Sequence, residues 1–275
     1  SVLIAVYSVT RPGAMEGVKY FLVPNVKNFS WMTVVAAMGQ MFYSLSIAMG
    51  ILITFGSYMK KETSLEDSTR NVEVFDTAIA IMAGLMIIPA VFAFSGGDPD
   101  TLQAGPALMF ITIPKVFENM GFGTVVGILF FLLVLFAAVT SSIALTESAV
   151  STFEDELGWS RRRATVLVGV IMIALGSLSS LGYGPLAGIK IIGMQFLDFF
   201  DFLTNSVMMP IAAMLTSLFV SRIVGMKRME EEIMHGESTF RRKKIFIVMI
   251  KYLCPVFALI ILISSVANAF GWIAM

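Results

Sequence analysis

The longest charge-free segment of the chain, residues 28–59, reads NFSWMTVVAAMGQMFYSLSIAMGILITFGSYM and lies between Lys27 and Lys60. A continuous α-helix of this length would extend about 48 Å, whereas the hydrocarbon core of a bilayer is about 30 Å thick. The centre of the segment, residues 43–50, contains two serines and a glycine, which are weaker helix formers than the flanking residues. The sequence therefore predicts a membrane helix that is broken near residues 43–50.

A break at membrane depth would leave backbone carbonyl groups without helical partners. Such groups are tolerated only where they are buried in protein or line a polar cavity, and their oxygens could bind a hard cation or a substrate ammonium group. A second polar cluster, Thr140-Ser141-Ser142, offers hydroxyl oxygens, although these hydroxyls could equally bond to their own preceding carbonyls. Considered together with the overlong helix, the two clusters favour a binding site.

The rest of the chain is also typical of a membrane protein. It is 57% hydrophobic and only 14% charged, whereas soluble domains are about 25% charged. Further charge-free runs, each about as long as the ~20 residues that a spanning helix needs, occupy residues 77–97, 119–146, 164–189, 202–221 and 252–275. We therefore predict an all-α polytopic protein with about six full spans after one partial span at residues 1–9, and we interpret the sequence as a fragment.

Several function classes are excluded by composition. The formal net charge is zero, which argues against a nucleic-acid partner. Cys254 is the single cysteine and His235 the single histidine, so an internal disulfide and a multi-cysteine or multi-histidine metal centre are impossible within the chain. The sequence shows no nucleophile–base arrangement and no phosphate-binding loop. We therefore predict that the protein is not an enzyme and has no cofactor.

The basic residues predict the orientation. Loops on one side of the predicted membrane carry 14 lysines and arginines, and those on the other side carry 5. The positive-inside rule places the richer side in the cytoplasm, which puts the C-terminus outside. On the outer side, the long loop at residues 95–120 contains PALMFITIPKVF, which suggests short helices that act either as a lid or as a plain cap.

Acidic residues strengthen the expectation of an ion site. Asp76 opens an apolar run, and a carboxylate at the membrane centre costs about 2.5–3.5 kcal/mol on insertion scales. At such a depth it needs a cation, a proton or another partner. Asp198 and Asp201 are three residues apart and share a helix face, and Glu147 and Asp155 are eight residues apart and can also share one.

Four segments resemble the neurotransmitter:sodium symporter family, close to its bacterial amino-acid transporters. GQMFYSLSIAMGILITFGSY (residues 39–58) resembles the family's broken sixth helix, and AAVTSSIAL (137–145), followed by FEDELGWSRRRA, resembles its eighth helix and next cytoplasmic loop. VTRPGAMEGVKYFLVPN (9–25) resembles the third outer loop, and FLDFFDFLTN (196–205) the start of the tenth helix. The resemblance implies the leucine-transporter-like fold, built from inverted repeats. Residues 1–275 would form a single transmembrane domain, from the end of helix five through helix eleven: the second repeat plus one further helix, with helices one to four missing.

The same resemblance implies roles for individual residues. The expected sodium ligands are Ser44 and Asp76 for a first ion, and the carbonyl of Ala137 with Thr140 and Ser141 for a second. The expected substrate pocket contains Tyr43, Ser46, Met49, Ser142 and Leu145. Asp201 matches the outer-gate carboxylate, whose arginine partner would lie in the missing first helix, and Ser57, Tyr58, Glu147 and Asp155 match the inner gate. Three residues depart from the family pattern: Tyr43 replaces a phenylalanine, Asp76 an asparagine and Ala48 a common glycine.

The resemblance thus implies sodium-coupled symport of an amino acid or related small amine into the cell by alternating access. The expected location is the inner membrane of a bacterium, as a multi-pass protein. The expected partners are the amino acid, sodium as the coupling ion, the lipid bilayer and the missing N-terminal helices. Two alternatives stay open: a cation channel, which also uses hydroxyl and carbonyl oxygens, and a non-transporting receptor or regulatory homologue.

Overall fold

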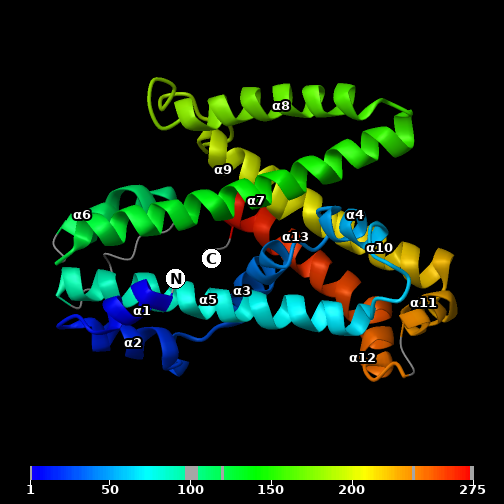
Figure 1. Cartoon of the computed structure of the whole chain (residues 1–275), viewed down its shortest axis with the longest axis horizontal. Coiled ribbons are helices and arrows are strands. Elements are labelled where there is room, and N and C mark those ends of the chain that lie inside the picture. Colours follow the sequence, from blue (N-terminus) through cyan, green and yellow to red (C-terminus); the bar gives the residue numbers. More distant parts are fainter. Residues whose placement is uncertain (1, 97–104, 119–120, 237–238, 273–275) are drawn as a thin grey trace. The chain divides into compact units, whose positions relative to one another are not determined.

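The computed structural model describes residues 2–96, 105–118, 121–236 and 239–272. Within this part of the chain the regular structure is helical, apart from one isolated β-bridge between Ile191 and Met194. The chain forms two compact units, of which the first comprises Ser1–Phe29 and Val72–Ser141, and the second Ser30–Asn71 and Ser142–Met275. Two long helices, α5 (Leu65–Ser95) and α7 (Gly123–Leu157), run through both units (Figure 1). One part of each helix belongs to the first unit and the other part to the second.

The remaining elements of the first unit are α1 (Val2–Val9), α2 (Ala14–Leu22), η1 (Val26–Asn28), the π-helical turn η3 (Leu108–Thr112) and α6 (Ile113–Glu118). Those of the second unit are α3 (Trp31–Ser44), α4 (Ile51–Ser57), α8 (Arg161–Leu181), α9 (Phe196–Asp201), η4 (Phe202–Met208), α10 (Met209–Phe219), η5 (Val220–Val224), α11 (Met226–Ile233), η6 (Met234–Gly236), α12 (Lys243–Val248), η7 (Met249–Leu253) and α13 (Cys254–Ala269). Several of these follow one another without interruption, because η4, η5 and η7 are π-helical turns inside longer helices.

Five helical segments of the described chain are long and apolar enough to cross a membrane, namely Leu65–Ser95, Gly123–Leu157, Arg161–Leu181, Phe196–Val224 and Lys243–Ala269. Together with the broken pair α3 and α4, they account for the six spans that the sequence predicts. Most of these segments begin or end well outside the charge-free runs. The first, for example, begins at Leu65 rather than at residue 77. Charged residues end an apolar run but not a helix, since glutamate, lysine and arginine are good helix formers.

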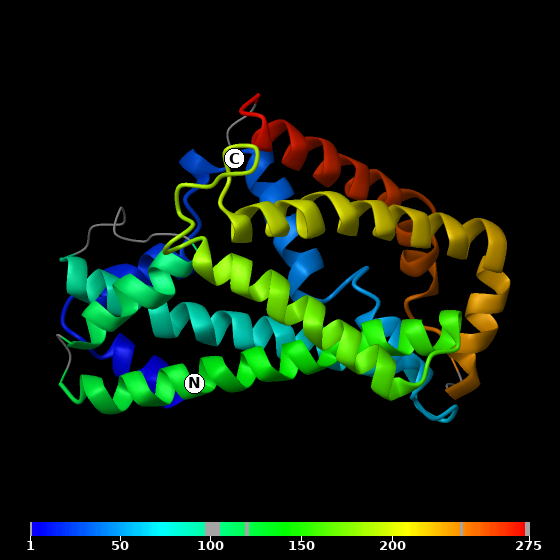
Figure 2. The ribbon, with the colours of Figure 1, turned by 90° about the horizontal axis from the view of Figure 1, so that it is seen from above.

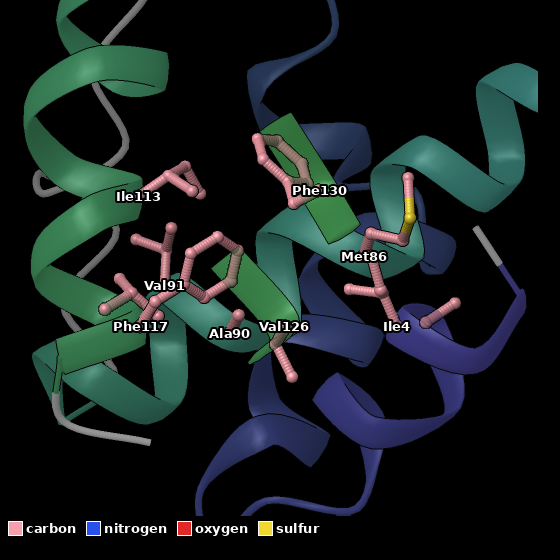
Figure 3. Packing of buried hydrophobic residues seen from close by; sticks show 10 residues of the cluster. Ile4, Met86, Ala90, Val91, Ile113, Phe117, Val126 and Phe130 are labelled. Carbon is pink, nitrogen blue, oxygen red and sulfur yellow. The ribbon is translucent and has the colours of Figure 1, made fainter. Parts of the chain in front are cut away.

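The core of the first unit is built from α1, α5, α6 and α7. Ile4, Val91, Ile113 and Phe117 are among its buried side chains; Figure 3 shows Val91, Ile113 and Phe117 close together and Ile4 beside Met86. The Ser8 hydroxyl donates to the Met86 carbonyl at 2.8 Å, which ties α1 to α5. The helical segment formed by η3 and α6 confirms the short helices that the sequence predicts for PALMFITIPKVF. The buried side chains of α6 anchor this segment to the core.

In the second unit, α10 and α13 pack side by side (Figure 2, yellow and red). Their contact buries Met209, Ala213, Ala258 and Ile261, and Phe42 of α3 joins the same cluster. Small residues at the contact allow the two backbones to approach closely, which is how helices associate in membranes.

Candidate functional site

The predicted break in the first long apolar segment is confirmed. Helix α3 ends at Ser44 and α4 begins at Ile51. Between them, the backbone of Ser46, Ala48 and Gly50 adopts the left-handed conformation, with φ angles of 54°, 64° and 79°. Ser46 and Ala48 are not glycines, and a left-handed non-glycine residue costs roughly 1–2 kcal/mol. Such strain persists only where the surroundings enforce it, and it is concentrated at functional sites.

A seam of small polar residues holds the second half of the broken helix against α7. The Thr54 hydroxyl lies 3.4 Å from that of Ser148 and 3.3 Å from that of Ser151, and the Ser148 hydroxyl lies 3.5 Å from the Met49 carbonyl oxygen. Thr54 and Ser148 are buried. A Cβ atom on Gly50 would lie only 2.6 Å from the Ser148 hydroxyl oxygen. Glycine at position 50 therefore avoids both the strain of a positive φ angle and a close contact with the Ser148 hydroxyl.

A charged network lies at the end of α4, one helical turn beyond this seam. The Tyr58 hydroxyl donates to the Glu147 carboxylate at 2.7 Å. Arg161, the first residue of α8, pairs with Glu147 and, at 3.2 Å, with Glu154. Exposed ion pairs contribute little to stability, so the main effect of the network is to fix the end of α4 beside α7 and α8.

The sequence indicated only part of this network. Tyr58 and Glu147 were expected at an inner gate, and the structure brings them together. Arg161 and Glu154 were missed as members of the network. The spacing of seven residues between Glu147 and Glu154 was the available signal for Glu154, since residues seven apart lie on the same face of a helix. Arg161 begins the next helix, so this spacing did not indicate it.

Two other residues expected at the inner gate lie outside the network. The Ser57 hydroxyl donates to the Thr54 carbonyl within its own helix at 2.7 Å. Asp155 is exposed near the end of α7. Asp201, expected at the outer gate, is the exposed last residue of α9, and its carboxylate accepts a hydrogen bond from the Asn205 side chain.

The residues expected to bind substrate lie on two elements of the second unit. Tyr43 lies near the end of α3, whereas Ser46 and Met49 lie in the break; Tyr43 is exposed and the other two are partly buried. Ser142 and Leu145 lie on α7, where Ser142 is partly buried and Leu145 exposed. The contact between Ser148 and the Met49 carbonyl joins these two elements one or two turns beyond Ser142 and Leu145.

The residues expected to bind sodium are divided between the units. Ser44, the last residue of α3, belongs to the second unit, while Asp76 on α5 and Ala137, Thr140 and Ser141 on α7 belong to the first. The Thr140 hydroxyl donates to the Ala137 carbonyl at 2.9 Å and to the Phe136 carbonyl at 3.0 Å. This is the backbone-bonding alternative that the sequence left open. It also places the hydroxyl beside a carbonyl of the same expected ligand set.

Comparisons with known proteins agree with this geometry. The Sodium:neurotransmitter symporter family profile matches residues 1–271. An uncharacterized sodium-dependent transporter of Bacillus subtilis, YhdH, is 33% identical over 237 residues, which are 86% of this chain and 52% of the relative. A second uncharacterized sodium-dependent transporter, from Haemophilus influenzae, is 32% identical over 263 residues, 95% of this chain and 56% of the relative. The chain thus spans about half the length of these curated relatives.

A solved structure is also similar. The crystal structure of MhsT in complex with L-phenylalanine superposes with a TM-score of 0.82 at 35% sequence identity, and the match covers 96% of this chain and 59% of MhsT. Together with the helical structure and the broken helix, this confirms the predicted leucine-transporter-like fold. The names of the relatives are those of transporters and not of enzymes. The chain belongs to the sodium:neurotransmitter symporter family.

Proposed function

We propose that the chain forms part of a symporter that uses sodium to carry an amino acid, or a related small amine, into the cell by alternating access. The observation that carries this proposal is the broken helix, with left-handed backbone at Ser46, Ala48 and Gly50 and polar contacts to α7. Unwound backbone and its carbonyls coordinate coupling ions in transporters of this architecture. The structure of MhsT with L-phenylalanine favours an amino acid as the substrate.

Within this proposal, sodium binds to the oxygens of Ser44, Asp76, Ala137, Thr140 and Ser141. The Asp76 carboxylate supplies the negative charge that an ion needs in a low-dielectric setting. Each sodium ion that enters down a potential of 100 mV releases about 2.3 kcal/mol, and a tenfold gradient adds about 1.4 kcal/mol. These amounts suffice to concentrate a substrate.

The substrate is proposed to lie against the break, between Tyr43, Ser46 and Met49 on one side and Ser142 and Leu145 on the other. Asp201 serves as the outer gate. Tyr58 and Glu147, with Ser57 and Asp155, serve as the inner gate. The hydrogen bond from Tyr58 to Glu147 supports this assignment, because it joins α4 to α7 at the end of α4.

The experiment is uptake of radiolabelled L-phenylalanine by proteoliposomes that contain the intact protein. We expect uptake that saturates with substrate and requires an inward sodium gradient. The control replaces the external sodium with potassium. Uptake that persists unchanged in potassium would contradict sodium coupling. A sodium current without substrate would favour a channel, and sodium-dependent binding without uptake would favour a receptor.

We further propose that residues 1–275 belong to one transmembrane domain in the inner membrane, with the C-terminus outside. The distribution of basic residues supports this orientation. Alkaline phosphatase, which is active only outside the cytoplasm, tests the orientation when it is fused after Met275. An active fusion is expected, and an inactive fusion at normal expression would reverse the topology.

A further inference from the structure

The hydroxyl of Ser148 differs from its neighbours on α7 in the direction of its hydrogen bond. The hydroxyls of Thr146, Ser151 and Thr152 donate to carbonyls of α7 itself, at 2.7 Å, 3.1 Å and 2.8 Å, as is common for such residues in membrane helices. The buried Ser148 hydroxyl donates instead to the Met49 carbonyl in the break, at 3.5 Å. It therefore acts on the break rather than on its own helix.

The Ser148 hydroxyl is itself held from α4. Thr54 Oγ1 donates to Ser148 Oγ at 3.4 Å and lies 3.3 Å from the Ser151 hydroxyl oxygen. Thr54 is buried, so water does not compete for these contacts. A hydroxyl that accepts one hydrogen bond while it donates another is polarised by the first bond. Thr54 therefore acts on the Met49 carbonyl through Ser148.

The peptide group that receives this bond joins Met49 to Gly50, and glycine allows it more than one orientation. Glycine populates positive and negative φ angles about equally, so no side chain at residue 50 prevents this peptide group from rotating. The structure holds Gly50 at a φ of 79°, with the Ser148 hydroxyl oxygen 2.6 Å from the place where a Cβ atom would lie. The bond from Ser148 selects one of the orientations that glycine permits.

The break also borders an apolar cavity of about 390 Å³, which Ser46, Ala48 and Gly50 help to line. Its other lining residues come from α3, α4, α10, η5, η7 and α13, and its surface is almost entirely apolar. Such a surface offers few hydrogen-bond donors to a carbonyl, and empty space does not hold the backbone by contact. The polar contact with α7 is therefore the one that orients the peptide group.

Ser148 also connects the two walls proposed for the substrate pocket. Met49 belongs to one wall, and Leu145 on α7 belongs to the other. Leu145 and Ser148 are three residues apart, so they share a helix face and are separated by about 4.5 Å along the axis. The bond from Ser148 to Met49 thus fixes the spacing of the two walls one turn from the pocket.

We propose that Ser148 is a positioning residue for the substrate and that Thr54 acts through it. Ser148 fixes the peptide group between Met49 and Gly50, and with it the direction of the Met49 side chain in the pocket. Thr54 keeps the Ser148 hydroxyl in the rotamer that this requires. The inference rests on the proposed function, because the pocket belongs to that proposal. The competing account is that the hydroxyls only hold α4 against α7, as polar residues do between other membrane helices.

The test measures uptake of L-phenylalanine by the intact protein in proteoliposomes, with the substrate varied at saturating sodium. The loss of one hydrogen bond typically changes an equilibrium by a factor of about two to ten. Ser148→Ala should therefore raise KM about fivefold and Thr54→Val about threefold. The kcat per folded protein and the sodium concentration for half-maximal uptake should stay unchanged. Thr54→Ser, which keeps the hydroxyl, should retain the KM of the unmodified protein.

The double variant Thr54→Val/Ser148→Ala tests whether Thr54 acts through Ser148. Independent effects would multiply to about fifteenfold, whereas we expect about fivefold, as in Ser148→Ala alone. The matched controls are Ser179→Ala and Thr69→Val, whose hydroxyls donate to carbonyls of their own helices at 3.0 Å and 2.8 Å. Both controls should keep the KM of the unmodified protein.

An unchanged KM in Ser148→Ala would overturn the proposal, and a lowered melting temperature at unchanged KM would assign the hydroxyls to packing alone. Thr54→Val decides in the same way if Ser148→Ala does not fold. A fifteenfold effect in the double variant would overturn the role of Thr54. Uptake that does not depend on sodium would refute the proposed function, while the comparison of KM values would still decide the role of Ser148. If the unmodified protein takes up no L-phenylalanine, both proposals fail.

Discussion

Two polar clusters of the chain have similar composition but fold differently. Residues 43–50 contain two serines and break their helix, whereas Thr140-Ser141-Ser142 lie in the uninterrupted helix α7. In the second cluster the Thr140 hydroxyl bonds to the carbonyls of the preceding turn, which leaves the helix intact. In the first, Gly50 has a positive φ and lies against Ser148. Serines alone therefore do not break a helix of this chain; the broken segment also has left-handed backbone, a glycine and a packing partner.

The largest effect is expected from Gly50→Ala, because it attacks the break itself. The new Cβ would lie 2.6 Å from the Ser148 hydroxyl oxygen, and φ of 79° is unfavourable for alanine. A left-handed alanine alone costs roughly 1–2 kcal/mol, and the clash adds to this. We expect sodium-driven uptake by the intact protein to be almost abolished, measured in proteoliposomes per folded protein.

Two further variants make this prediction specific. Gly56→Ala, whose Cβ would meet nothing within 4 Å, should keep uptake. Gly50→Ala combined with Ser148→Gly removes the clash and should restore part of the activity. Normal uptake by Gly50→Ala would mean that the close approach to Ser148 is not needed.

A large effect is also expected from replacing Asp76, which is the one charged residue among the proposed sodium ligands. Asp76→Ala should raise the sodium concentration for half-maximal substrate binding at least about tenfold, since an opposite charge within 4–6 Å typically shifts an ionic equilibrium by one to three powers of ten. Scintillation proximity binding at varied sodium measures this. Asp67→Ala, an exposed residue in the first turn of the same helix, is the control. An unchanged sodium dependence would remove Asp76 from the site.

A moderate effect is expected at Thr140, and it tests whether the cluster in the uninterrupted helix α7 also binds a sodium ion. Thr140→Val preserves shape but removes the hydroxyl, and we expect sodium affinity to fall about fivefold, as for the loss of one hydrogen-bond-strength contact. Thr152 makes the same kind of bond, to the Ser148 carbonyl at 2.8 Å, outside the proposed site. Thr152→Val is therefore the matched control. Equal behaviour of the two variants would assign the Thr140 hydroxyl to backbone bonding alone.

The smallest effect on uptake is expected from removing chloride. The resemblance to the family implies that chloride-dependent members balance the sodium charge with the anion, whereas Asp76 can supply a fixed negative charge here. Ala80, one turn further along α5, lacks the hydroxyl expected of a chloride ligand. Uptake at constant sodium should be unchanged when gluconate replaces chloride. A large loss of rate would defeat this prediction, and chloride sensitivity in Asp76→Asn would support it.

Much of the architecture was predictable from the sequence because it depends on local properties. Charge-free runs locate spans, since a charge in hydrocarbon is costly wherever it occurs. The break near residues 43–50 follows from an excess of length and from weak helix formers at the centre. The short helices η3 and α6 were also indicated. Helix ends were predicted less well, because the polar ends of α5 and α7 continue as helix beyond the apolar runs.

The features of the candidate site likewise fall into those that the sequence predicts and those that it does not. The sequence by itself determined the helical membrane fold and the position of the break, and its motifs indicated the family. Only the tertiary structure decided that Gly50 meets Ser148, that Arg161 joins Glu147 and Glu154, and that an apolar cavity opens beside the break. The physical reason is that each of these features joins residues distant in the chain, and their contacts depend on how whole helices pack rather than on local composition.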